Sequence, residues 1–109
     1  MGLTKSEIFS EEQNDLANLL KAMAHPARIA ILQRILISKT CICGDLVEEL
    51  GLAQATISQH LKELKTAGII QGSIEGVKVC YCINPVVWKL LELQLGRFLS
   101  SYAGASNCC

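Results

Sequence analysis

The sequence of 109 residues lacks a net charge and a long apolar run. Ten basic residues balance ten acidic ones, so no overall charge attracts the chain to nucleic acid, and any binding to DNA must come from local geometry and dimerisation. No apolar run approaches the roughly 18 residues of a membrane span, and the first residues lack the apolar core of a signal peptide. We therefore expect a cytoplasmic protein with no membrane partner.

The sequence also lacks the Cys-x-x-Cys motif of thiol-disulfide enzymes and the βαβ pattern that surrounds it. Its six cysteines would suggest disulfides in a secreted chain of this size. In a reducing compartment the same number indicates metal ligation or thiol chemistry. We expect a protein that is not an enzyme.

The centre of the chain predicts a helix-turn-helix. Its first half repeats apolar residues at helical spacing: Leu46, Val47 and Leu50. Gly51 follows where a helix C-cap needs a residue that tolerates positive φ, and a second helix is expected from about Gln54. The buried stripe of that helix consists of Ile57, Leu61 and Leu64.

The opposite face of this second helix carries side chains that reach base edges and phosphates in a major groove: Gln54, Thr56, Ser58, Gln59 and Lys62. Considered alone, the stretch also fits an ordinary solvated helix face. The flanking elements favour the first interpretation.

Two helices are predicted before this motif. Thr4 and Ser10 each begin a capping-box pattern, so either could start the first helix. Apolar residues then repeat at helical spacing: Leu16, Leu19, Leu20 and Met23. Pro26 is suited to the first position of the next helix, which runs to about Ser38 with His25 as its cap. That helix is apolar nearly all round, which predicts a place in the middle of the core.

A β-hairpin is predicted after the motif. Residues 69–74 have the pattern of a strand, Glu75-Gly76 that of a two-residue turn, and residues 77–83 that of the returning strand. Helices followed by such a hairpin predict an α+β, mainly α, winged helix-turn-helix.

Asn84-Pro85 opens a last helix with more apolar residues than a small domain buries alone: Val87, Leu90, Leu91, Leu95, Phe98, Leu99 and Tyr102. We expect N- and C-terminal dimerisation helices, although a helix that only caps the monomer core is the alternative. Residues 1–103 then form one DNA-binding and dimerisation domain, and residues 104–109 form a flexible tail that ends in Cys108-Cys109.

Four segments carry a resemblance to a known family: Leu20 to Arg28 with Ile31-Leu32, Gly44 to Leu46, Ala53 to Leu61 with Leu64, and Ala67 to Ile69 with the hairpin. Over nearly its whole length the chain resembles the ArsR/SmtB family of metal-responsive winged-helix repressors. The resemblance implies a homodimer that occupies an operator and leaves it when an inducing ion binds. It implies recognition residues at Gln54, Ala55, Thr56, Ser58, Gln59 and His60. Lys62 and the wing residue Lys78 complete the candidate DNA contacts.

Two departures from the family pattern stand out. Ala53 occupies the position where a serine often caps the recognition helix. The run Cys41-Ile-Cys43-Gly-Asp-Leu resembles the arsenic-sensing motif Cys-Val-Cys-Asp-Leu with a glycine inserted, so its thiols lie one residue further from the helix. Their geometry does not carry over unchanged.

Alternation along the returning strand separates its side chains into two sets. Val77, Val79, Tyr81 and Ile83 share one face, and Lys78, Cys80 and Cys82 share the other. The apolar set must face the core, so the two cysteines are expected to face away from it. If residues 40–43 add a short third strand beside the hairpin, the two Cys-x-Cys pairs become neighbours. Cysteines that act only as small buried hydrophobes are the alternative.

These observations predict a dimeric repressor on an inverted-repeat operator, released when trivalent arsenic or antimony binds cysteine thiolates; zinc or another thiophilic ion also suits such ligands. The candidate ligands are Cys41, Cys43, Cys80, Cys82, Cys108 and Cys109. One hypothesis is a ligand set that combines the terminal pair with Cys80 or Cys82, and the competing one combines Cys41 and Cys43 with a thiol of the adjacent strand.

His60 is expected either on the DNA face or in helix packing. Alternative functions are a redox or persulfide sensor that uses the same cysteines, and a winged-helix protein-interaction module.

Overall fold

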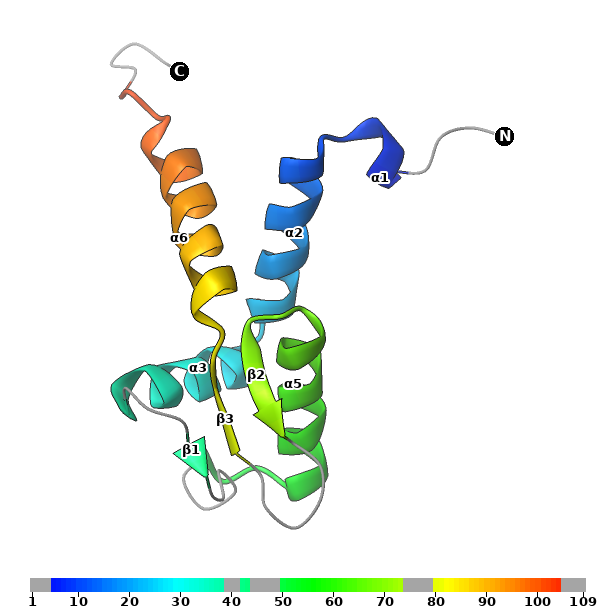
Figure 1. The fold of residues 1–109 in the computed structure, drawn as a ribbon, viewed down its shortest axis with the longest axis vertical. Coiled ribbons are helices and arrows are strands. Elements are labelled where there is room, and N and C mark those ends of the chain that lie inside the picture. Colours follow the sequence, from blue (N-terminus) through cyan, green and yellow to red (C-terminus); the bar gives the residue numbers. More distant parts are fainter. Residues whose placement is uncertain (1–4, 39–41, 44–49, 74–79, 105–109) are drawn as a thin grey trace.

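The structure is a computed structural model that describes residues 5–38, 42–43, 50–73 and 80–104 (Figure 1). Its elements are, in chain order, α1 (Lys5–Ile8), α2 (Glu11–Met23), α3 (Pro26–Ser38), β1 (Ile42–Cys43), α5 (Gln54–Thr66), β2 (Ile70–Ser73), β3 (Cys80–Ile83) and α6 (Pro85–Ser100). This is the mainly helical winged-helix arrangement that the sequence predicts. No helix in these ranges is long and apolar enough to cross a membrane.

Helix α2 begins at the second of the two predicted capping boxes. The Gln13 N–H donates to Ser10 Oγ at 3.1 Å, and the Ser10 N–H donates to Gln13 Oε1 at 2.9 Å. Both bonds satisfy backbone N–H groups at the start of the helix, and Glu11 and Glu12 add negative charge where the helix dipole favours it. The other candidate, Thr4, lies outside the described residues.

Helix α3 has the predicted bounds, but its predicted place in the middle of the core is wrong. One side is buried through Ile31, Leu32 and Ile35, whereas the other leaves Ile29, Leu36 and Ile37 exposed. The physical reason is that α3 packs against α2, α5 and β3, which together cover one side of it. Its cap is the predicted one, because His25 Nδ1 accepts a hydrogen bond from the Ala27 N–H at 3.0 Å.

The strands form a three-stranded antiparallel sheet in the order β1-β3-β2. The short third strand expected beside the hairpin is therefore confirmed. On the core side, Tyr81 is buried and Ile83 packs against the core cluster, as the alternation predicts. The predicted turn at Glu75-Gly76 lies outside the described residues, as do residues 44–49, which include most of the predicted first helix of the motif.

Gly72 in β2 lies where only glycine fits. Its φ is +127°, and an added Cβ would meet Cys80 O and lie 2.8 Å from Tyr81 Cα. We expect Gly72→Ala to lower the free energy of unfolding by roughly 1–3 kcal/mol, because it combines backbone strain with a clash between strands. Urea denaturation measures this.

The control is Gly96→Ala in α6, where an added Cβ has no neighbour within 4 Å among the described atoms. Removing a helical glycine there should raise the free energy of unfolding by about 0.5–1 kcal/mol. A Gly72→Ala chain as stable as the wild type would contradict the assigned strand pairing.

Helix α5 presents its predicted apolar stripe to the core, because Ile57, Leu61 and Leu64 are all buried. Gly51 has a φ of +70°, as expected for the residue that ends the preceding helix. The stripe packs on α2, α3 and β2, so the opposite face of α5 is turned to solvent.

Helix α6 starts at Pro85, after Asn84 caps it by accepting hydrogen bonds from the Val86 and Val87 N–H groups at 3.1 and 3.4 Å. Figure 1 shows α2 and α6 extending from the same side of the body formed by the sheet, α3 and α5, and diverging toward their outer ends. Helix α6 reaches the core through Leu91, and Val87, Trp88 and Leu95 pack against the same core cluster. Other apolar residues along α6 and just after it are exposed: Leu90, Leu93, Phe98, Leu99 and Tyr102.

Candidate nucleic-acid interface

The outer face of α5 carries most of the residues predicted to contact DNA. Five of them are exposed: Gln54, Ala55, Thr56, Gln59 and Lys62. Ser58 is partly buried and accepts a hydrogen bond at 3.3 Å from the Gln54 amide, while the Gln59 amide donates to Glu63 at 3.0 Å. These amides and hydroxyl are the kinds of donors and acceptors that read base edges.

The start of α5 confirms the departure at Ala53. This residue occupies the N-cap in an extended conformation, and its side chain makes no capping hydrogen bond. Because a helix has backbone N–H groups without helical acceptors in its first turn, those of α5 can donate to an anion such as a DNA phosphate.

His60 lies on the inner side of α5 and is 8% exposed. Its Nδ1 accepts a hydrogen bond from Arg28 Nε at 3.1 Å, and its ring centroid lies 4.4 Å from that of His25. Of the two roles predicted for His60, the structure shows helix packing. Burial lowers its pKa, the positive charges of His25 and Arg28 lower it further, and Glu63 opposes them.

Sequence reasoning missed the role of Arg28. The guanidinium donates from Nη1 to the Ala22 carbonyl at 3.0 Å as well as from Nε to His60. The available signal was a cation three residues after His25 in a helix that is otherwise largely apolar.

The sheet brings cysteines of two strands together. The β1–β3 register pairs Cys43 with Cys80, and the β2–β3 register pairs Gln71 with Cys82. Cys82 is a partly buried free thiol whose Sγ lies 3.9 Å from Gln71 Nε2. The sulfur of Cys80 is in a disulfide. Cys43 and Cys80 are therefore neighbours in the backbone, as predicted, whereas Cys41 of the first Cys-x-Cys run lies outside the described residues.

Four predicted site residues lie outside the described residues: Cys41, Lys78, Cys108 and Cys109. Within the described ranges, no three or more His, Cys, Asp or Glu side chains are grouped closely enough to hold a metal ion.

Comparison with known proteins places this geometry in a family. The family described as "Bacterial regulatory protein, arsR family" matches residues 25–71, which include α3, β1, α5 and the start of β2. The transcriptional repressor PagR of Bacillus anthracis is 34% identical over 80 residues, which are 72% of this chain and 80% of PagR. The chain belongs to the ArsR family. This family consists of DNA-binding transcriptional regulators and not of enzymes.

Other ArsR-like proteins extend the comparison. The HTH-type transcriptional repressor SmtB of Mycobacterium tuberculosis is 44% identical over 63 residues, which are 58% of this chain and 46% of SmtB. The chain thus matches less than half the length of that relative. The crystal structure of the antimony-specific transcriptional repressor AntR aligns with a TM-score of 0.62 and 26% identity over 93% of this chain and 96% of AntR. The winged-helix fold of this ArsR chain is therefore confirmed over nearly its whole length.

Proposed function

We propose that this chain is a homodimeric repressor that binds an inverted-repeat operator, with α5 of each subunit in a major groove. The observation that carries the proposal is the exposed polar face of α5, which stands opposite the apolar stripe that anchors the helix. Two recognition helices of a symmetric dimer would enter successive major grooves about 34 Å apart.

Substitutions in α5 and the wing test this proposal. Ser58→Ala and Gln59→Ala are expected to reduce discrimination between operator and unrelated DNA by about 1–3 kcal/mol for each good hydrogen-bonded contact to a base that they remove.

Lys78→Ala should weaken binding to all DNA about equally and reduce the salt dependence of binding, because it removes a positive charge that would neutralise a phosphate. Fluorescence anisotropy on both DNAs at two salt concentrations measures these effects. A change in base preference for Lys78→Ala but not for Ser58→Ala would reverse the two roles.

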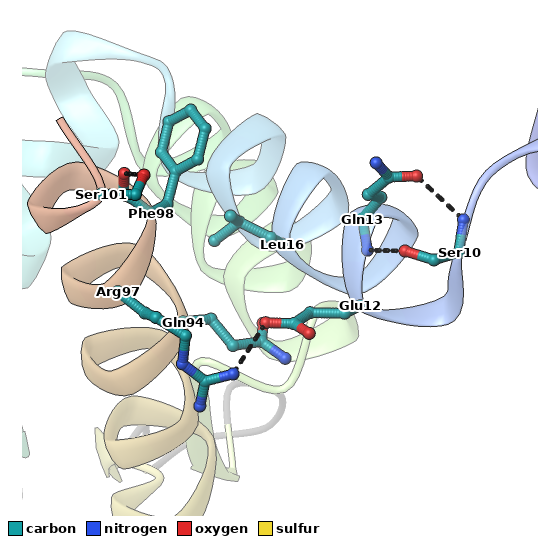
Figure 2. A pocket seen from close by; sticks show the side chains of 8 residues that line it. All are labelled: Ser10, Glu12, Gln13, Leu16, Gln94, Arg97, Phe98 and Ser101. Atoms are coloured by element: carbon teal, nitrogen blue, oxygen red, sulfur yellow. Dashed lines mark hydrogen bonds and ion pairs between the residues drawn. The ribbon is translucent and has the colours of Figure 1, made fainter.

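The outer ends of α2 and α6 support a dimer. Between them is a cavity of about 380 Å³, where Leu16 and Phe98 contribute apolar side chains and Arg97 forms an ion pair with Glu12 at 3.4 Å (Figure 2). Gln94 Oε1 is buried there with no hydrogen-bond partner among the described residues. A second subunit would bury the apolar side chains and could bring a donor to this oxygen.

The inducer that we propose is trivalent arsenic or antimony, bound by thiolates. The strand register supports this donor type, because it pairs Cys43 with Cys80 and the free thiol Cys82 belongs to the same sheet; Cys80 would supply a thiolate once its disulfide is reduced. Such soft donors favour thiophilic ions, and the similarity to a repressor described as antimony-specific supports this ligand class. Titrating the reduced protein and operator with arsenite, antimonite and zinc tests the proposal: the metalloids should release the DNA at lower concentrations than zinc does.

A second candidate, a redox or persulfide sensor, is favoured by the disulfide at Cys80. In this function a change in thiol oxidation alters operator affinity without an ion. The test compares the operator affinity of protein treated with dithiothreitol with that of protein treated with peroxide, both in the presence of a chelator. This comparison separates the redox sensor from the metalloid sensor. Release by oxidation alone would support this candidate, and release by arsenite alone would support the first.

A further inference from the structure

Arg28 joins three helices at the inner end of α5. The residue itself belongs to α3, its Nη1 donates to the Ala22 carbonyl in the last turn of α2, and its Nε donates to His60 in α5. The last carbonyls of a helix have no donor within the helix, so the bond to Ala22 ties Arg28 to an end that needs one. The recognition helix is thereby attached to the junction of α2 and α3 through one guanidinium.

This attachment requires a neutral His60. Nδ1 accepts the bond from Arg28 only when it carries no proton, so the proton of the neutral ring is on Nε2. A second proton would turn Nδ1 into a donor that faces another donor, and would place a cation against Arg28 and beside His25. Glu63 is the one negative group among the charges that act on this ring in the described part of the chain, and Arg28 and His25 act against it.

The position of His60 connects the attachment to DNA contacts. His60 follows Gln59 in α5, and Thr56 lies one turn before it, so the inner ring and these two exposed side chains share one rigid segment. We propose that Arg28 and His60 are positioning residues for the recognition helix, and that a proton on His60 breaks their bond and weakens operator binding. This inference rests on the proposed binding of operator DNA.

Variants at the two positions test the inference in the full-length protein. His60→Phe keeps an aromatic ring but removes the acceptor, and His60→Asn keeps an acceptor near the place of Nδ1. Arg28→Lys keeps the charge but removes the donor at Nε. Operator affinity is measured by fluorescence anisotropy between about pH 5 and pH 8, at a temperature at which each variant is folded.

We expect His60→Phe and Arg28→Lys each to bind the operator at least roughly tenfold more weakly than the wild type at pH 8, the effect of removing a hydrogen bond to a charged group. The double variant should be no weaker than Arg28→Lys alone, because Arg28→Lys already removes the bond that His60→Phe breaks. His60→Asn should bind nearly as the wild type does. The wild-type affinity should fall as the pH decreases through the pKa of His60, which burial and the nearby cations hold below its usual value, and His60→Asn should lack that decrease.

Ile35→Val is the matched control, because it removes one buried methylene group of α3 and leaves the Arg28–His60 hydrogen bond intact. It should lower the melting temperature and leave operator affinity and its pH profile unchanged. Wild-type affinity in His60→Phe, additive effects in the double variant, or an unchanged pH profile in His60→Asn would each overturn the inference. If the wild type itself showed no preference for operator over unrelated DNA, the proposed function would fail instead.

Discussion

Replacing Phe98 and Leu99 together with glutamate is expected to convert the proposed dimer to a monomer and to weaken operator binding by roughly 100-fold or more. Both side chains are 63% exposed in the single chain, so the fold tolerates a carboxylate at either position. A dimer that buries this part of α6 would have to desolvate the new charges, which is strongly unfavourable without a partner. Each recognition helix would then bind its half-site alone, without the high effective concentration that a dimer provides.

Sedimentation velocity and fluorescence anisotropy measure the two parts of this prediction. Ile37→Glu is the matched control, because Ile37 is 74% exposed but lies at the end of α3 rather than on α6. It should remain dimeric and bind as the wild type does. A Phe98/Leu99 variant that sediments like the wild type would place the dimer interface elsewhere, and a monomer with wild-type affinity would contradict the two-half-site arrangement.

Replacing Cys108 and Cys109 together with serine is expected to abolish release from the operator by arsenite. Allosteric effectors typically change affinity by about 5–150-fold, and the variant should lack that whole response. This expectation follows from the first of the two hypotheses for the inducer site, which joins the terminal pair to Cys80 or Cys82 as three thiolates, a set that suits trivalent arsenic. Reduction of the disulfide at Cys80 would make both sheet cysteines free thiols.

The length of α6 indicates which subunit supplies the sheet cysteine. Its 16 residues extend about 24 Å, and Gly104, the last described residue, follows its outer end, away from β3 (Figure 1). In the proposed dimer, we expect a tail that starts there to reach the sheet of the partner subunit more readily than its own. Binding of the ion would then connect two subunits and favour one dimer geometry. Because the dimer geometry sets the spacing of the recognition helices, an ion bound far from them would change operator affinity.

Anisotropy titrations with arsenite compare this variant with Cys80→Ser and Cys82→Ser. An absent response in the tail variant and in one sheet variant supports the joint site. If arsenite still releases DNA from the tail variant at wild-type concentrations, the joint site is wrong, and Cys41 and Cys43 with a thiol of the adjacent strand replace it.

Much of the fold was predictable because local signals determine where helices begin and end. Ser10, Pro26 and Asn84 start α2, α3 and α6 through bonds or ring geometry that involve only nearby residues. The spacing of Ile57, Leu61 and Leu64 predicted both the buried stripe of α5 and its polar outer face. Alternation along β3 likewise predicted that Tyr81 faces the core.

The tertiary structure decided what depends on contacts between elements distant in sequence. Because α3 has apolar residues nearly all round, its sequence did not show which side would be buried. The structure shows that α2, α5 and β3 cover one side, which leaves Ile37 exposed on the other. The sequence left His60 between two roles, and the bond from Arg28, 32 residues earlier, shows that it packs inside. The pairing of Cys43 with Cys80 depends on strand register, which is set by how β1 docks on β3 and not by either strand alone.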